Sequence, residues 1–289
     1  MLTITLKENY NAPTLSVKQE PHLPRWYFPI VLLRIILVAL LTLVWSVPVL
    51  IFSFFDPHAE RSAQLIRFWA RCVLWVCGIT ITVQGREQLD PTRAYLFMAN
   101  HQSNVDIPVL MAAFAHLQVR WVSKQEVRKV PVIGICMART HQVLVDRDSP
   151  TQAISVIRRV RALLTDGISV IFFPEGTRTR DGHLQAFKPG GFVVALESRV
   201  PVVPITLNGS RAIWAPGGFD LRPGTVTVEF SEPIMVDPQL SKRAAREWLS
   251  AQVHKAMVAR LHETPVPPPS SVNVSPVAVS TSASEHPSS

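Results

Sequence analysis

The sequence predicts an α/β protein in which a mostly parallel β-sheet is flanked by helices and preceded by an N-terminal membrane-associated helical segment. Beyond residue 78, short β-rich runs alternate with stretches of helical period, which is the pattern of βαβ units. Before residue 78, long apolar stretches dominate the chain. With 289 residues and 47% hydrophobic content, the chain is long enough to bury a sizeable core.

The charge balance indicates an anionic partner. The chain has a net charge of +8, which fits nucleic acid, a phospholipid surface or a phosphate-bearing substrate. Only 17% of the residues are charged, however, and this low share favours a membrane protein over a nucleic-acid binder. The cysteines, Cys72, Cys77 and Cys136, show no CxxC or zinc spacing, so we expect reduced packing residues and a catalytic domain on the reducing, cytoplasmic side.

An uncharged run near the N-terminus predicts a membrane segment. Residues 35–55 carry no charge over 21 positions, which as a helix roughly matches the thickness of a bilayer core. The run is too long and too far from Met1 for a signal peptide. Pro48 lies inside it, so both a spanning helix and a shallow hairpin are open.

The segment that follows, residues 63–77, predicts an interfacial helix. Its polar side chains, Gln64, Arg67 and Arg71, share one helical face of an otherwise apolar stretch. The predicted division of the chain is a tail over 1–25, membrane-anchoring helices over 26–78, a catalytic domain over 79–262 and a disordered Pro/Ser-rich tail over 263–289.

Within the catalytic domain, β-rich runs and helical periods alternate. The predicted strands are 79–83, 94–99, 119–123, 142–145, 169–173, 202–207 and 225–230. The predicted helices are 107–116, 126–138, 151–165, 191–198 and 242–261.

Four of the predicted strands run directly into polar residues that could do chemistry. These residues are Asn100 and His101, Lys124, Asp146 and Arg147, and Glu175 and Arg178. In open α/β sheets, ligands bind outside the carboxyl ends of the strands, so a parallel arrangement brings these groups to one edge. The set predicts a site for an anionic substrate with acid/base chemistry.

His101 and Asp106 are candidate partners across a loop-to-helix junction. Five residues on one helix would place them about 140° apart, so they cannot meet on a shared face. Pro108 suits the first turn of a helix, which puts Asp106 near the N-cap and His101 in the preceding loop. Asp106 would then fix the imidazole tautomer while the other ring nitrogen takes a proton from an alcohol.

Residues 173–178, FPEGTR, combine a strand end with a tight turn and a cation. Gly176 permits backbone N–H groups to face a phosphate, and Arg178 adds a bidentate donor. Taken alone, the same residues also fit a plain turn with a solvated Glu175 and Arg178.

Over roughly residues 80–210, the chain resembles the glycerolipid acyltransferases of the lysophosphatidic acid acyltransferase (PlsC-like) group. Four ordered blocks carry the resemblance: NHQSNVD at 100–106; Lys124 with Pro131, Gly134 and 145–147; FPEGTR at 173–178 with Phe187 and Lys188; and VPVVPI at 200–205. Pro189 departs from the family pattern, in which a second basic residue often follows the lysine.

The resemblance implies a glycerol-3-phosphate acyltransferase-like fold and an acyl transfer from acyl carrier protein or coenzyme A to the sn-2 hydroxyl of 1-acyl-sn-glycerol 3-phosphate. It implies His101 and Asp106 as catalytic residues. The implied substrate-binding residues are Asn100, Ser103, Lys124, Arg147, Glu175, Gly176, Thr177, Arg178 and Lys188. Glu175 would orient Arg178 or the acceptor. No metal or cofactor and no nucleic acid is expected, and the expected location is a bacterial inner membrane with a cytoplasmic catalytic domain.

Other functions stay open at this point. The acceptor could be another lysolipid, or the chain could be a catalytically silent lipid-binding protein. A membrane-associated phosphohydrolase would need a phosphate-attacking nucleophile or a metal cluster, and the sequence offers neither. The sequence also carries no GxSxG elbow, Walker A loop or GxGxxG signature.

Overall fold

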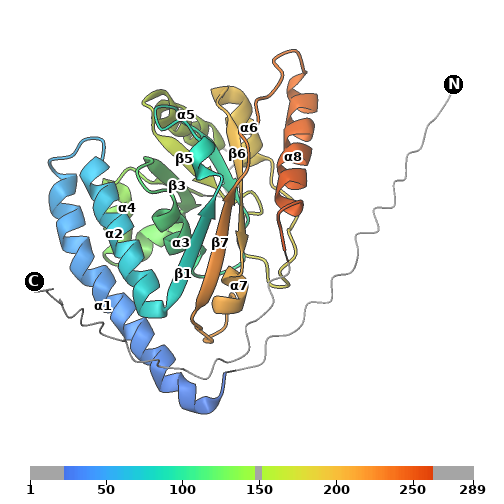
Figure 1. Ribbon diagram of the computed structural model, residues 1–289. Coiled ribbons are helices and arrows are strands. Elements are labelled where there is room, and N and C mark those ends of the chain that lie inside the picture. Colours follow the sequence, from blue (N-terminus) through green and yellow to red (C-terminus); the bar gives the residue numbers. More distant parts are fainter. Residues whose placement is uncertain (1–22, 147–151, 263–289) are drawn as a thin grey trace, which may run out of the picture.

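In the computed structural model, which describes residues 23–146 and 152–262, seven strands form one sheet in the order β1-β7-β6-β2-β5-β3-β4 (Figure 1). The strands are β1 (Ile79–Gln84), β2 (Leu96–Ala99), β3 (Val119–Lys124), β4 (Val143–Val145), β5 (Ser169–Phe172), β6 (Val202–Asn208) and β7 (Gly224–Phe230). Each of the predicted strands is present, with ends that differ from the prediction by at most two residues.

Five neighbouring strands, β6, β2, β5, β3 and β4, run in one direction. The pair β6 and β7 is antiparallel, and β1 pairs parallel to β7, so these two outer strands run the opposite way. The prediction of a mostly parallel sheet is therefore confirmed. The carboxyl ends of five adjacent strands meet at one edge, where α/β proteins bind their ligands.

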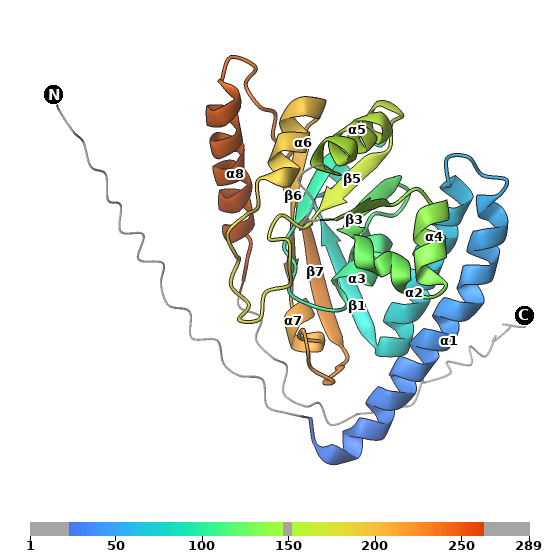
Figure 2. The same ribbon diagram turned by 180° about the vertical axis from the view of Figure 1, so that it is seen from behind.

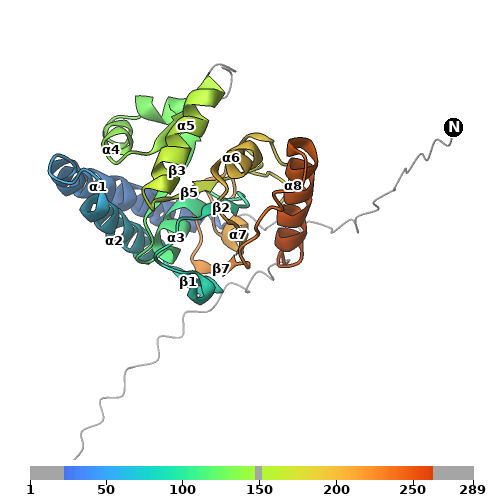
Figure 3. The same cartoon turned by 90° about the horizontal axis from the view of Figure 1, so that it is seen from above.

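Helices cover both faces of the sheet because side chains alternate along each strand. From β2, Phe97 belongs to the core that α2 and α3 cover, whereas Leu96 and Met98 belong to the core under α5, α6 and α8. Figures 2 and 3 show these two helical layers on opposite sides of the strands. The helices are α1 (Phe28–Ser53), α2 (Glu60–Cys77), α3 (Asp106–Ala113), α4 (Ile133–Arg139), α5 (Gln152–Thr165), α6 (Gly190–Ser198), α7 (Ser210–Ile213) and α8 (Lys242–Val258), with short 3-10 turns η1 (Arg25–Tyr27), η2 (Arg86–Gln88) and η3 (Gln125–Lys129).

The N-terminal segment folds as a helical hairpin. Helix α1 continues through Pro48 without a break, and the chain reverses only after Phe55, where Ala59 has a φ of 50°. The alternative of a shallow hairpin inside the uncharged run is therefore wrong. By length and composition, residues 25–53 are the one segment of the described chain that could cross a membrane, and an 18-residue stretch within it has a mean hydropathy of 2.8.

Helix α2 lies between α1 and the sheet. Ala70, Val73 and Leu74 are buried on its inner side, against the core that includes β1 and α3. Arg67, one of the residues of the predicted polar face, points toward the catalytic domain and donates from Nη1 to the Leu117 carbonyl over 3.4 Å. The predicted interfacial helix therefore also packs against the catalytic domain through this side.

The predicted helix over 126–138 is two separate pieces, η3 and α4. Pro131 lacks the N–H that a continuous helix requires, and Val132 adopts a φ of 64° before α4 begins. The helix α7 was not predicted, because four residues are too few to show a period. The other four predicted helices correspond to α3, α5, α6 and α8. Most of the predicted tail over 1–25 and the whole of 263–289 lie outside the described residues.

Candidate active site

His101 and Asp106 meet at the carboxyl end of β2. Asp106 is the first residue of α3, and His101 lies in the loop between the strand and this helix. The His101 Nδ1 and Asp106 Oδ2 atoms are 2.7 Å apart, with the carboxylate fully buried and the imidazole side chain 14% exposed. The two side chains thus meet across a loop-to-helix junction, as their sequence spacing requires, and the imidazole of His101 stays partly exposed to solvent.

The Asp106 carboxylate also folds the loop around itself. Its Oδ2 atom accepts the backbone N–H groups of Gln102 and Ser103, each over 2.7 Å. Because this oxygen accepts from two N–H donors, the matching assignment for His101 is a proton on Nδ1. The His101 Nε2 atom is then the acceptor that is available to a substrate hydroxyl.

The side chains of Asn100 and Ser103, like that of Gln102, anchor this loop to the protein. The Asn100 amide accepts from Leu207 N over 2.7 Å and donates to Leu207 O over 3.1 Å, so it continues the pairing of β2 with β6. Ser103 Oγ donates to the Trp214 carbonyl over 2.7 Å. Both side chains are buried. Their polar groups position the loop, whereas the sequence predicted that they bind substrate.

An aromatic ring supports the imidazole from the neighbouring strand. Phe173, which follows β5, stacks on His101 with ring centroids 4.0 Å and planes 16° apart. Trp121 of β3 also packs against Phe173, with ring centroids 5.9 Å apart. Phe173 was predicted as a strand end and as the first residue of the FPEGTR block, without a role in the site, so its contact with His101 is a feature that the sequence did not predict.

The turn after β5 is bonded directly to the loop of His101. Glu175 Oε1 accepts His101 N over 2.8 Å, Glu175 Oε2 accepts Gln185 N over 3.0 Å, and Thr179 N donates to the His101 carbonyl over 2.9 Å. Gly176 has a φ of 75°, which favours glycine. Of the two roles expected for Glu175, orienting Arg178 or orienting the acceptor, the first does not agree with these contacts, because both carboxylate oxygens accept backbone N–H groups.

Burial dominates the electrostatics of Glu175. Its side chain is 2% exposed, and this desolvation raises the pKa of its carboxyl to about 7, although the N–H groups of Gln185 and His101 favour the charged form. The charges of Asp106 and Asp181 raise the pKa of Glu175 further. Glu175 therefore carries a proton over part of the neutral range.

The predicted cations lie at the same edge of the sheet. Arg178 is exposed and donates from Nη1 to Asn104 Oδ1. The Lys188 side chain crosses Gly176, where a Cβ atom would lie 2.8 Å from Lys188 Cδ. Lys124 ends β3 and lies 2.7 Å from Glu126 Oε1, with half of its side chain exposed.

Two further predicted residues complete the set. Thr177 is exposed in the turn between Gly176 and Arg178. Arg147 lies outside the described residues. The structure thus brings Thr177, Arg178 and Lys188 together at the turn after β5, which is hydrogen-bonded to the loop of His101. Lys124 lies on β3, the next strand of the sheet.

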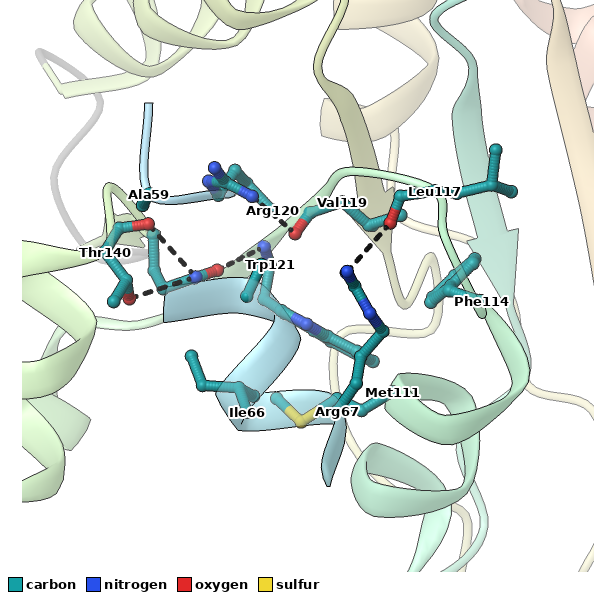
Figure 4. Close-up of a pocket in the computed structure, with 12 residues that line it drawn as sticks. Ala59, Ile66, Arg67, Met111, Phe114, Leu117, Val119, Arg120, Trp121 and Thr140 are labelled. Atoms are coloured by element: carbon teal, nitrogen blue, oxygen red, sulfur yellow. Dashed lines mark hydrogen bonds between the residues drawn. The ribbon is translucent and has the colours of Figure 1, made fainter. Parts of the chain in front are cut away.

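A small cavity lies between α2, α3 and β3 (Figure 4). Arg67 and Arg120 line it together with apolar side chains that include Met111 and Phe114. Its volume is about 30 Å³, which is enough for roughly two water molecules and too small for a long acyl chain. Trp121 lines the same cavity and connects it to the Phe173 ring beside His101.

Arg120 joins the helical hairpin to the sheet. This side chain is 1% exposed and donates from Nη2 to the His58 carbonyl in the loop between α1 and α2. Its burial lowers the pKa of the Arg120 guanidinium to about 10, which leaves it charged at neutral pH. No group of His, Cys, Asp and Glu suited to a metal ion occurs among the described residues.

The fold and the site define the class of this protein: an open α/β domain with a carboxylate-paired histidine and a cationic turn at the carboxyl ends of its parallel strands. The family model described as Acyltransferase matches residues 80–208. The 1-acyl-sn-glycerol-3-phosphate acyltransferase alpha of Homo sapiens is 31% identical over 198 residues, which cover 66% of this chain and 70% of that protein. The chain therefore belongs to the acyltransferase family.

Other relatives carry the same name. The 1-acyl-sn-glycerol-3-phosphate acyltransferase of Limnanthes douglasii is 37% identical over 57% of this chain and 58% of its own length. That of Cocos nucifera is 34% identical over 68% of this chain and 63% of its own. The matches thus span less than two thirds of these two plant relatives.

A solved structure has the same fold. The crystal structure of the 1-acyl-sn-glycerophosphate (LPA) acyltransferase PlsC from Thermotoga maritima matches with a TM-score of 0.66 and 23% identity. The match covers 81% of this chain and 97% of that chain.

Proposed function

We propose that this chain transfers a fatty acyl group from an acyl thioester to the sn-2 hydroxyl of 1-acyl-sn-glycerol 3-phosphate and thereby forms phosphatidic acid. The observation that carries the proposal is the 2.7 Å contact of His101 with a buried carboxylate, at a sheet edge that also holds Arg178 and Lys188. The names of the relatives from Limnanthes douglasii, Cocos nucifera and Homo sapiens support this choice of acceptor.

In the proposed reaction, His101 Nε2 takes the proton of the acceptor hydroxyl as its oxygen attacks the thioester carbonyl carbon. A C–O bond forms, and the tetrahedral intermediate then collapses with cleavage of the C–S bond. The imidazolium returns its proton to the leaving thiolate. Asp106 holds Nδ1–H and stabilises the imidazolium throughout. Because a thiolate is a good leaving group, the reaction needs no covalent serine, metal or cofactor.

The acceptor's phosphate is proposed to bind at the cationic turn. Arg178 follows Gly176 by two residues, and the Lys188 side chain crosses this glycine, so both cations lie at the turn after β5. The Gly176 N–H donates to the Phe173 carbonyl over 3.0 Å, so the two cations rather than this N–H would hold the phosphate. Lys124 and Arg147 are proposed to complete the phosphate site from the ends of the neighbouring strands. The Asn104 amide holds Arg178 beside the loop of His101.

The helical hairpin, residues 26–78, is proposed to anchor the catalytic domain, residues 79–262, to the membrane. Exposed apolar side chains cover α1, among them Leu33, Leu40 and Val44. Both the acceptor and the acyl chain of the donor partition into a bilayer, so this anchor would keep the active site near its substrates. We propose the inner membrane of a bacterium, with the catalytic domain on the cytoplasmic side and acyl carrier protein or coenzyme A as the carrier.

An assay of the purified chain tests the proposal. Vesicles or detergent micelles would present a panel of lysophospholipids, each with an acyl-carrier-protein thioester and with a coenzyme A thioester. We expect acyl transfer to 1-acyl-sn-glycerol 3-phosphate, with phosphatidic acid as the product. Transfer only to lysolipids without a terminal phosphomonoester would overturn the proposed acceptor, and release of inorganic phosphate would overturn the reaction type.

A further inference from the structure

The segment between β3 and β4 exposes apolar side chains to an unusual extent. Val130, Ile133 and Ile135 are 42%, 39% and 59% exposed. They occur within six residues, with Val130 directly after η3 and Ile133 and Ile135 in the first turn of α4. We call this region the η3–α4 surface, and it consists of Arg128, Lys129, Val130, Ile133, Ile135 and Arg139.

This surface is continuous with the apolar surface of α1. Helix α4 packs on the C-terminal half of α1, where Cys136 Sγ is 4.0 Å from the Ser46 carbonyl (Figures 1 and 3). The Arg139 guanidinium carbon lies 3.8 Å from the centre of the Phe54 ring. Phe54 and Phe55 are 68% and 78% exposed, so the apolar side chains of α1 lead directly to α4.

The charges of the η3–α4 surface fit an anionic partner. Arg128, Lys129 and Arg139 are exposed around the apolar residues, and the acidic residue of η3, Glu126, lies 2.7 Å from Lys124. Long basic side chains beside exposed isoleucines are typical of segments that lie in the headgroup region of a bilayer, where the cations reach phosphate groups and the apolar groups reach acyl chains.

We infer that the η3–α4 surface is a second membrane contact, which docks in the headgroup region of a bilayer that contains anionic phospholipid. The inference rests on the proposed membrane anchoring by α1. Because Lys124 joins β3 to η3, this contact would hold the sheet edge of His101 at the depth of the lipid headgroups. A lysophospholipid could then reach the site without leaving the interface.

A fluorescent probe tests the position of this surface. The full chain with Cys72, Cys77 and Cys136 replaced by alanine, once shown to be folded and active, would carry one new cysteine labelled with a polarity-sensitive dye at Ile135→Cys. The matched control is Val258→Cys on α8, a residue that is 49% exposed on the opposite helical layer. Both proteins are reconstituted into vesicles of phosphatidylcholine and phosphatidylglycerol, and flotation measures binding.

We expect the dye at position 135 to shift its emission to shorter wavelength and to be quenched by lipids that carry a quencher near the headgroup, while the dye at 258 does neither. A water-like emission at 135 on protein that floats with the vesicles would overturn this inference alone. Failure of the protein to float would overturn the membrane anchoring as well.

Substitutions test the contribution to binding. Ile133→Asp combined with Ile135→Asp should weaken partitioning to anionic vesicles by about tenfold, from the loss of apolar burial. Val258→Asp should leave partitioning unchanged. Activity on a short-chain acceptor that is soluble as a monomer should survive both changes, which separates a membrane contact from a folding defect. Equal partitioning of the wild type, the Ile133→Asp/Ile135→Asp protein and the Val258→Asp protein would contradict the inference.

Discussion

The imidazole of His101 lies flat on the phenyl ring of Phe173, with ring centroids 4.0 Å apart. One side of the imidazole is thus fixed by an aromatic ring, and its Nδ1 atom by the Asp106 carboxylate. Two independent contacts therefore determine where His101 Nε2 points. The proposed proton transfer needs such control, because a general base must lie within hydrogen-bond reach of the hydroxyl.

Loss of the stacking ring should slow the reaction without unfolding the protein. Phe173→Leu removes an aromatic contact of about 0.5–1.5 kcal/mol, so we expect kcat to fall by up to about tenfold while KM changes little. Phe114→Leu is the matched control, since Phe114 packs against Phe97 and Phe230 in the core. The control should lose stability and keep kcat. Steady-state kinetics and thermal unfolding of both variants measure the difference, and equal kcat values for the two would contradict it.

Arg178 should discriminate acceptors by their phosphate. Arg178→Ala removes a charge-assisted contact of about 1.5–3 kcal/mol, so KM for a phosphomonoester acceptor should rise by about 10–100-fold. Arg243→Ala on α8, which removes an exposed ion pair with Glu247, should change nothing. The comparison is the ratio of kcat/KM for acceptors with and without a terminal phosphate. If Arg178→Ala impaired both acceptors equally, Arg178 would not bind the phosphate.

Glu175 should make the protein less stable as the pH rises towards neutrality. Burial raises the pKa of this carboxyl from an ordinary value of 4.5 to about 7 in the folded chain. Between these values the folded state keeps a proton that the unfolded state has lost. The stabilising contribution of the protonated group is therefore complete below pH 4.5, declines from there to about pH 7 and is constant above.

The measurement is the free energy of unfolding in detergent at several pH values. The decline caused by Glu175 should be on the order of 3 kcal/mol, and Glu175→Gln should remove it. Glu197→Gln is the control, because Lys242 lowers the pKa of the partly exposed Glu197. If the pH dependence of the Glu175→Gln protein matched that of the wild type, the raised pKa of Glu175 would be refuted.

Gly134 should tolerate no side chain. A Cβ atom at this position would lie 2.1 Å from the Arg128 carbonyl oxygen, which belongs to the backbone and cannot rotate away. We expect Gly134→Ala to lower the free energy of unfolding by about 2–3 kcal/mol. Gly190→Ala is the control, because a Cβ atom at Gly190 would meet nothing within 4 Å. Equal stability of the two variants would contradict the close approach of η3 and α4.

The strands and the polar residues that follow them could be predicted in their order along the chain, because both depend on local sequence patterns. Apolar runs that end in Asn100, Lys124 and Glu175 mark strand ends whether or not the neighbours are known. The meeting of His101 with Asp106 could also be predicted, since Pro108 restricts where the helix begins.

The contacts that join distant segments could not be predicted in the same way. Glu175 binds the backbone of His101 across 74 residues, and Asn100 binds Leu207 across 107. Such contacts depend on which strands are neighbours in the sheet, and sequence spacing does not encode this. For the same reason, Asn100 and Ser103 were predicted to bind substrate, although their polar groups hold the loop to β6 and to Trp214.

The role of His101 is tested most directly by acyl transfer from a labelled thioester to 1-acyl-sn-glycerol 3-phosphate, with the products separated by thin-layer chromatography. The wild type should form labelled phosphatidic acid. His101→Ala should lower kcat by at least about 10³-fold, and Asp106→Asn by a similar factor, while thermal unfolding shows that the His101→Ala protein is folded. Undiminished transfer by folded His101→Ala would contradict the assignment of His101 as the base.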